Sequence, residues 1–126
     1  MIQVQTILKV SDNSGVQTVR CIKVLGGFKK KYAKLGDVIV VSVQKIRNMS
    51  KRNSKIKKGD IFKALIIRTK IKYNKKNGLQ FCFNENSVVL INKQENLLGT
   101  RVIGPLPKIL RNIKFNKLIS LSAGLI

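Results

Sequence analysis

The chain has 126 residues, of which 26 are Lys or Arg and 5 are Asp or Glu, so its formal net charge at pH 7 is +21. A hydrophobic fraction of 44% argues against disorder, which needs few apolar residues together with high charge. The length favours one domain, and no apolar run approaches the roughly 20 residues of a membrane span. Such an excess of cations favours a polyanionic partner, and we predict structured RNA.

The residue types that carry most catalytic and metal chemistry are missing or scattered. The chain has no His, and its five acids, Asp12, Asp37, Asp60, Glu85 and Glu95, are isolated from one another. General acid–base catalysis near neutral pH usually needs His or a perturbed carboxylate. We therefore expect no enzymatic activity, no metal, no cofactor, no small-molecule substrate and no membrane partner. Cys21 and Cys82 lie in apolar, strand-like sequence and are predicted to be buried, reduced thiols.

In chain order, the first part of the sequence predicts short strands separated by turns. The first six residues lead directly into strand-like sequence, so we expect no targeting segment before the fold. Apolar-rich or β-branched stretches at residues 6–10, 19–25, 37–46 and 61–68 are expected to be strands. Turn residues separate the first three of them, at Ser11-Asp12-Asn13-Ser14-Gly15 and at Gly26-Gly27.

One local pattern occurs twice. Residues 34–39 and 57–62 both read Lys-x-Gly-Asp followed by two apolar residues. Each copy places a glycine turn directly before a hydrophobic strand. We interpret the pattern as repeated turn chemistry and not as a duplicated domain.

The next part of the chain predicts a hairpin and a further strand. Asn77-Gly78 lies between residues 71–75 and 79–83, and both turn residues tolerate positive φ. Residues 88–92 predict another short strand. Phe62, Phe81, Phe83 and Phe115 are assigned to the core. Phe28, Tyr32 and Tyr73 are expected to pack on the folded body, with stacking on nucleic-acid bases as the alternative.

After Gly104-Pro105 and Pro107 the pattern becomes helical. Leu106, Ile109, Leu110 and Ile113 recur at helical spacing, and Phe115, Leu118 and Ile119 predict a second short helix. The first of these helices is expected to dock on the strands or on a protein partner, with a membrane surface as the alternative. The chain is thus predicted to be mainly β, a small closed barrel with one or two short C-terminal helices.

Three clusters of basic residues are predicted to bind RNA phosphates. Seventeen of the 26 cations fall between Lys29 and Lys76, where the only acids are Asp37 and Asp60. In a strand, Arg68, Lys70 and Lys72 would share one face. The clusters consist of Lys29, Lys30, Lys31 and Lys34; of Lys45, Arg47, Lys51, Arg52, Lys55, Lys57 and Lys58; and of Arg68, Lys70, Lys72, Lys75 and Lys76.

Over essentially its whole length the chain resembles the universal large-subunit ribosomal protein family called L-fourteen, of the bacterial and organellar type. The most specific stretch runs from Ala64-Leu65-Ile66-Ile67 through Asn77-Gly78, Phe83 and Asn86 to Val89-Leu90-Ile91. Other matching motifs are Met1-Ile2-Gln3-x-Gln5-Thr6, Asp12-Asn13-Ser14-Gly15, Cys21-Ile22-Lys23-Val24-Leu25-Gly26-Gly27, Tyr32-Ala33, Gly36-Asp37, Lys57-Lys58-Gly59-Asp60 and Gly99-Thr100-Arg101.

The resemblance implies a five-stranded β-barrel with a protruding β-ribbon over about residues 1–103 and a short helical part over about residues 104–126. It implies a structural protein that binds large-subunit rRNA and touches small-subunit rRNA in intersubunit bridges. Ribosomal proteins called L-nineteen and L-three would be its neighbours. A ribosome silencing factor would dock on a face that includes Thr100, Arg101 and Lys117.

Some stretches depart from the family pattern, and one rival function stays open. The C-terminus Ser122-Ala123-Gly124-Leu125-Ile126 differs from the usual family ending, and residues 47–55 are unusually rich in Asn, Ser and Lys. The rival is a free-standing barrel that binds single-stranded nucleic acid. Twenty Lys against six Arg, with abundant Ile and Asn, indicates an AT-rich genome. We therefore expect an organelle-encoded protein of the mitochondrial matrix, with a plastid or the bacterial cytoplasm as alternatives.

Overall fold

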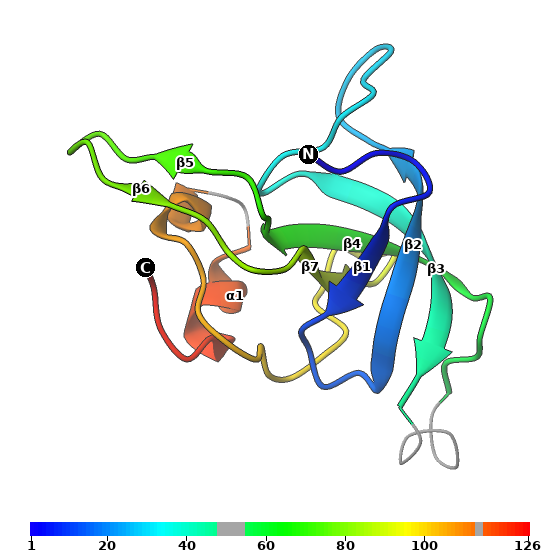
Figure 1. The fold of residues 1–126 in the computed structure, drawn as a ribbon. Coiled ribbons are helices and arrows are strands. Elements are labelled where there is room, and N and C mark those ends of the chain that lie inside the picture. Colours follow the sequence, from blue (N-terminus) through cyan, green and yellow to red (C-terminus); the bar gives the residue numbers. More distant parts are fainter. Residues whose placement is uncertain (48–54, 113–114) are drawn as a thin grey trace.

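The computed structural model describes residues 1–47, 55–112 and 115–126. Five strands close a barrel in the order β1, β2, β3, β4 and β7 (Figure 1). They are β1 (Ile7–Val10), β2 (Val16–Val24), β3 (Val38–Ile46), β4 (Ile61–Arg68) and β7 (Ser87–Ile91). Neighbouring pairs are antiparallel except β1 and β7, whose parallel pairing closes the barrel. The predicted closed, mainly β fold is confirmed.

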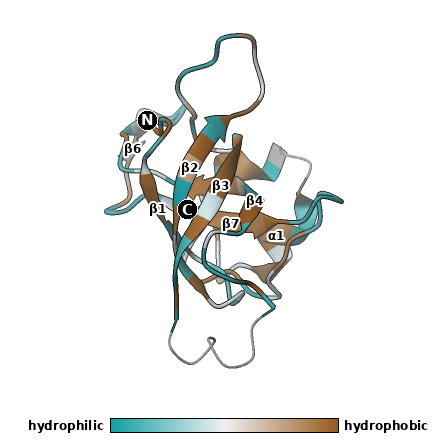
Figure 2. Cartoon of the chain, turned by 90° about the vertical axis from the view of Figure 1, so that its right-hand side faces the viewer, coloured by the Kyte–Doolittle hydropathy of each residue, from teal (hydrophilic) through white to brown (hydrophobic). Residues whose placement is uncertain are grey.

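Strands β4 and β7 are buried on both faces, which explains their continuous apolar sequences. Ala64 and Ile66 of β4, with Val88 and Leu90 of β7, face the barrel interior and join one core cluster. Their chain neighbours, such as Leu65 and Val89, join a second cluster outside the barrel. Strand β1, in contrast, alternates exposed and buried residues because only one of its faces is covered. Figure 2 shows hydrophobic residues concentrated on the barrel strands.

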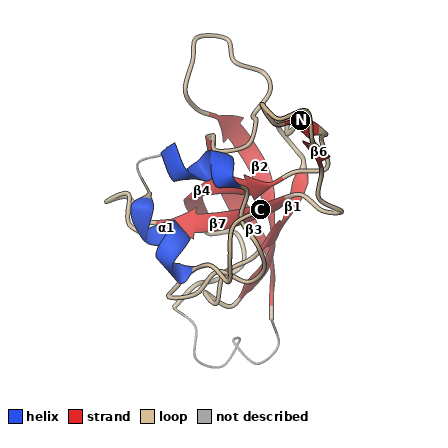
Figure 3. Ribbon diagram, turned by 90° about the vertical axis from the view of Figure 1, so that its left-hand side faces the viewer, coloured by secondary structure: helices blue, strands red, loops and turns tan. Residues whose placement is uncertain are grey.

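The C-terminal part covers the outer faces of β4 and β7. It contains a 3-10 helix, η2 (Lys108–Asn112), and a short α-helix, α1 (Asn116–Leu121). Leu106, Leu110 and Leu118 are at most 2% exposed and pack in the outer cluster. Figure 3 shows the two helices, in blue, beside β4 and β7. The helix expected from 106 to 113 is instead a shorter 3-10 turn that begins after Pro107. Leu106 is not helical because it forms a β-bridge with Leu125 and because the proline that follows it disfavours helical backbone there. Ile113 lies outside the described residues.

A short β-ribbon extends from the barrel between β4 and β7. It consists of β5 (Tyr73–Asn74) and β6 (Gln80–Phe81), and Asn77-Gly78 forms its turn as predicted. The Tyr73 and Phe81 rings stack at 5.7 Å, and Phe83 meets the Phe81 ring edge-on at 5.9 Å. Phe81 and Phe83 thus stabilise the ribbon, and their assignment to the core was wrong. Phe62 and Phe115 do pack against the two cores.

The repeated Lys-x-Gly-Asp pattern forms the same turn twice, as predicted. In the first turn the Asp37 carboxylate accepts the Lys34 backbone N–H at 2.8 Å, and in the second Asp60 accepts that of Lys57 at 2.8 Å. Both glycines adopt positive φ, 83° at Gly36 and 92° at Gly59. The first turn is followed directly by β3, and the second is followed directly by β4.

Two predictions about burial were wrong. Cys82 is exposed because it lies beyond the end of β6, whereas Cys21 is fully buried in the barrel as predicted. Phe28 is 93% exposed and Tyr32 is 45% exposed, because the loop after Gly26-Gly27 projects from the barrel (Figure 1). Within the described residues no helix is long and apolar enough to cross a membrane.

Candidate nucleic-acid interface

The loop between β2 and β3 presents the first basic cluster. Lys29, Lys31 and Lys34 are exposed, and Lys29 Nζ lies 5.4 Å from the centre of the exposed Phe28 ring. Lys30 differs, because its Nζ lies 2.8 Å from Asp37 Oδ2 and both side chains are only 27% exposed. Lys30 therefore ties the loop to the start of β3, and its three neighbours carry charge into solvent.

The second cluster lies at the opposite end of β3. Strand β3 starts after the first loop and ends at Ile46, where Lys45 and Arg47 are exposed. Lys55, Lys57 and Lys58 are exposed on the approach to β4, whereas Lys51 and Arg52 lie outside the described residues. The first and second clusters are thus separated by the length of a nine-residue strand.

The third cluster follows the ribbon. Lys70, Lys72 and Lys76 are exposed, and Lys75 is half-buried with its Nζ 5.4 Å from the centre of the Phe81 ring. The Tyr73 hydroxyl accepts the Leu35 backbone N–H at 3.1 Å, which fixes the base of the ribbon to the loop that carries Lys34. The structure therefore brings the first and third clusters together, although 38 residues separate Leu35 from Tyr73.

Arg68 does not belong to this exposed surface, and the prediction that it shares a strand face with Lys70 and Lys72 was wrong. Strand β4 ends at Arg68, and a register shift between Ile66 and Arg68 breaks the alternation. Arg68 is 8% exposed, and its Nη2 donates to Ser11 Oγ and, at 3.0 Å, to the Ile103 carbonyl oxygen. Burial lowers the pKa of this guanidinium, opposed by the nearby Glu85 carboxylate.

A second exposed surface is the face around Thr100, where the Asn13 side chain hydrogen-bonds to the backbone. Thr100, Arg101 and Lys117 are all exposed, and Thr100 and Lys117 line one groove of about 310 Å³ together with Leu97 and Leu121. The Asn13 side-chain oxygen accepts the backbone N–H groups of Thr100 at 2.7 Å and of Arg101 at 3.2 Å. The structure thus brings the three residues predicted for protein docking to one region.

Few cations have acidic partners. Among the described residues the ion pairs are Lys9–Glu85 at 2.6 Å, Lys30–Asp37 at 2.8 Å and Arg68–Glu85 at 3.9 Å. Glu85 has a lowered pKa, chiefly because the Lys9 side chain hydrogen-bonds to it. The exposed lysines that the structure describes in the three clusters therefore have no acidic partner among the described residues, which suits them to binding phosphates.

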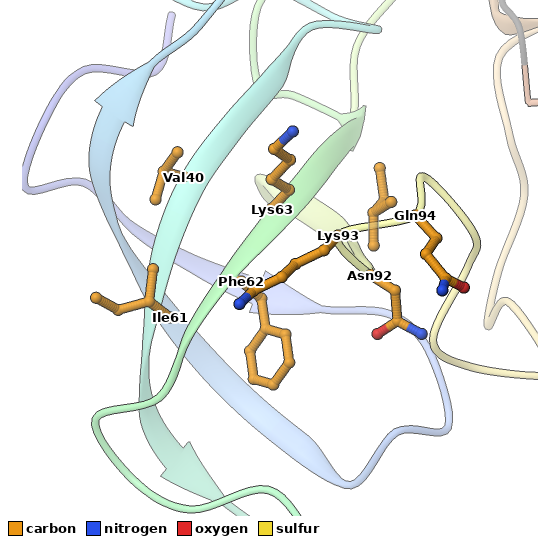
Figure 4. A pocket seen from close by; sticks show the side chains of 8 residues that line it. Val40, Ile61, Phe62, Lys63, Asn92, Lys93 and Gln94 are labelled. Carbon is orange, nitrogen blue, oxygen red and sulfur yellow. The ribbon is translucent and has the colours of Figure 1, made fainter.

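Sequence reasoning missed two lysines beside a pocket on the side of the barrel. Lys63 of β4 and Lys93 after β7 line a hollow of about 600 Å³ with an apolar part that includes Val40, Ile61 and Phe62. Figure 4 shows these side chains around the hollow. Lys63 lies inside an apolar strand and Lys93 stands alone in sequence, so neither formed part of a cluster. The alternation of side chains along a strand could have indicated Lys63. Its neighbours Phe62 and Ala64 pack in the barrel interior, so Lys63 points outward.

The described residues contain no group of three or more His, Cys, Asp or Glu that could hold a metal ion. The surface is instead a barrel with basic loops at both ends, a basic ribbon and a separate grooved face. The family model of ribosomal protein L14p/L23e matches residues 1–126, so this chain belongs to that family of structural proteins of the large ribosomal subunit.

Proposed function

We propose that the chain binds large-subunit rRNA directly through its three basic clusters and so contributes to the structure of the ribosome during translation. One observation carries this proposal: cluster lysines such as Lys29, Lys31 and Lys58 are exposed and have no acidic partner among the described residues. Lys and Arg that neutralise phosphates release counterions, which makes binding favourable and dependent on salt. Basic loops that are fixed to a rigid barrel suit recognition of folded RNA by its shape and backbone.

We further propose that the face around Thr100 takes part in the intersubunit region. Its exposed Thr100, Arg101 and Lys117 would meet a protein such as a ribosome silencing factor, while basic loops reach small-subunit rRNA in bridges. The ribosomal proteins called L-nineteen and L-three would pack on other parts of the surface. The lysine-rich composition supports a mitochondrial ribosome as the location.

Charge reversal in the first cluster tests rRNA binding. The double variant Lys29→Glu, Lys31→Glu should reduce incorporation into large subunits, measured in a sucrose gradient, because it places acids against phosphates. Lys30 is left unchanged, since its ion pair with Asp37 stabilises the loop. The matched control is Lys23→Glu, Lys108→Glu, two exposed residues outside the three clusters and outside the face around Thr100, and it should incorporate like the wild type. Circular dichroism checks that each barrel is folded.

Two results would count against the proposal. Equal incorporation of the two double variants into large subunits would show that the first cluster does not contact rRNA. A wild-type chain that binds any single-stranded oligomer and never sediments with large subunits would support the free-standing barrel. No described barrel strand carries an exposed aromatic side chain on which such oligomers could stack, which favours the ribosomal function.

A further inference from the structure

A recess on the outer surface of the barrel concentrates polar residues from three strands, β1, β2 and β4, and from the segments next to the strands. Its volume is about 330 Å³, and its lining includes Lys9 and Val10 at the end of β1 and Gln17 and Thr18 near the start of β2. Figure 1 shows β1 and β2 as neighbouring strands. Strand register builds the recess, because Lys9 pairs with both Thr18 of β2 and Ser87 of β7, and Ser87 pairs with Arg68 of β4. These pairings align Thr18, Lys9, Ser87 and Arg68 in one row across the sheet.

The lining of the recess is cationic. Lys9, Arg47 and Arg68 contribute to it, and Glu85 is its single acid. Glu85 Oε2 lies 2.6 Å from Lys9 Nζ, whereas its Oε1 lies 3.9 Å from Arg68 Nη2, so Glu85 chiefly neutralises Lys9. The Arg47 side chain makes no hydrogen bond or ion pair with any residue that the structure describes. Two guanidinium charges are therefore left largely without a counterion.

Arg68, which lines the recess, has a hydrogen-bond donor without an acceptor among the described residues. Its side chain is 10% exposed, and its buried Nε–H group finds no acceptor among the described residues. A buried donor without an acceptor costs stability unless another group satisfies it. The Gln17 amide and the Thr18 hydroxyl, which also line the recess, add neutral donors beside the two guanidinium groups.

We propose that this recess binds one phosphodiester group of the RNA backbone. Guanidinium forks and neutral N–H and O–H donors are the groups that bind phosphate oxygens, and arginine does so in a fixed, planar geometry. A single diester carries one negative charge, which the excess of cations in the recess can balance. The proposal rests on the proposed binding of rRNA, and it adds a half-enclosed site made mostly of residues outside the three basic clusters.

Nuclear magnetic resonance of the full-length ¹⁵N-labelled chain can test the recess directly. Dimethyl phosphate, inorganic phosphate and a short RNA duplex are titrated in turn at low ionic strength, where exposed charges are least screened. The diester and the RNA should both shift the Arg47 and Arg68 Nε–H signals and the backbone amides of Gln17 and Thr18. Arg47 is the residue to change, because Arg68 also holds the fold together.

Three variants give the expected pattern. Arg47→Gln should weaken dimethyl phosphate binding at these signals about fivefold or more, because it removes one charged hydrogen-bond donor. Glu85→Gln should strengthen it about twofold or more, because it removes the only negative charge of the recess. Lys23→Gln, an exposed residue outside the recess, is the matched control and should bind like the wild type.

Each other outcome overturns the proposal in a recognisable way. If RNA binds and Arg47→Gln behaves like Lys23→Gln, the recess is no phosphate site, while rRNA binding by the outer clusters stands. If the recess signals respond to inorganic phosphate but to neither the diester nor RNA, it is a site for free phosphate. If the wild-type chain binds no RNA at all, this proposal and the proposed function both fall.

Discussion

The Asn13 side chain holds the backbone of Thr100 across 87 residues of sequence. Its oxygen accepts the Thr100 N–H at 2.7 Å, and its Nδ2 donates to the Thr100 hydroxyl at 2.6 Å. The neighbouring Asp12 is fully buried and accepts the Leu90 N–H of β7 at 3.1 Å. Two adjacent side chains thus connect the turn after β1 both to the barrel and to the face around Thr100.

Asn13→Ala should lower the free energy of unfolding by about 1 kcal/mol, because the exposed amide loses three hydrogen bonds that water partly replaces. Hydrogen exchange at the Thr100 and Arg101 amides should become faster, because both lose their acceptor. Asn84→Ala is the matched control, since Asn84 is exposed and its side chain makes no hydrogen bond to a described residue. Equal denaturation midpoints and exchange rates for the two variants would show that the Asn13 hydrogen bonds do not stabilise the fold.

Gly104→Ala should destabilise the chain by about 2 kcal/mol or more, because a Cβ there would clash with Arg68 Nη1 and Gly104 has a φ of 88°. Gly124→Ala is the control, since a Cβ at Gly124 meets no heavy atom within 4 Å. Urea unfolding measures both. Introducing Gly104→Ala into an Arg68→Met background should cost less than in the wild type, and additive costs would show that Arg68 is not the obstacle.

The two thiols should differ sharply in reactivity. Cys21 is fully buried, and burial raises the pKa of its thiol, so it stays protonated and inaccessible near neutral pH. Cys82 is exposed. A thiol reagent such as Ellman's reagent should therefore label one cysteine rapidly in the folded chain and both in guanidinium chloride. Cys82→Ser should abolish the rapid reaction and Cys21→Ser should leave it, and the reverse assignment would contradict the described burial.

Glu85 should make stability depend on pH. The hydrogen bond from Lys9 holds the pKa of Glu85 below its ordinary value of 4.5, so the ionised form is favoured in the folded state. Its stabilisation is present above that ordinary pKa and is lost as the pH falls through the lowered one. Because the Glu85 side chain is 37% exposed, the effect should stay below about 1 kcal/mol.

Unfolding of the wild type and of Glu85→Gln, measured in phosphate-free buffer between about pH 3 and pH 7, checks this dependence. The difference between the two should be largest near neutral pH and should vanish in acid. Glu95→Gln is the control, because the Glu95 side chain makes no hydrogen bond or ion pair with a described residue. A constant difference across the range would show that the Lys9–Glu85 pair contributes nothing.

Hydrophobic periodicity made the barrel predictable. The continuous apolar stretches of β4 and β7 indicated strands, and the structure shows that they are continuous because the C-terminal part covers their outer faces. Turn chemistry was equally local, and both Lys-x-Gly-Asp turns formed where the sequence placed them. Patterns within a few residues of each other therefore sufficed for the barrel strands and their turns, but not for the first C-terminal helix, which is a 3-10 turn.

Properties that depend on distant segments could not be predicted in the same way. Arg68 is buried because residues 103 and 104, from beyond β7, lie against it, and nothing near Arg68 in sequence signals that contact. Phe28 is exposed because its loop leaves the barrel, although aromatic residues are more often covered. The recess also depends on register across four strands, and its residues Lys9, Thr18 and Arg47 are scattered along the sequence.

Fractionation of a native lysate by density gradient, combined with ultraviolet crosslinking, tests the central claim most directly. The chain should sediment with large subunits and whole ribosomes, follow the large subunit when low magnesium separates the two, and crosslink to large-subunit rRNA through its basic loops. A chain that stays at the top of the gradient, or crosslinks to other RNA alone, would contradict the account.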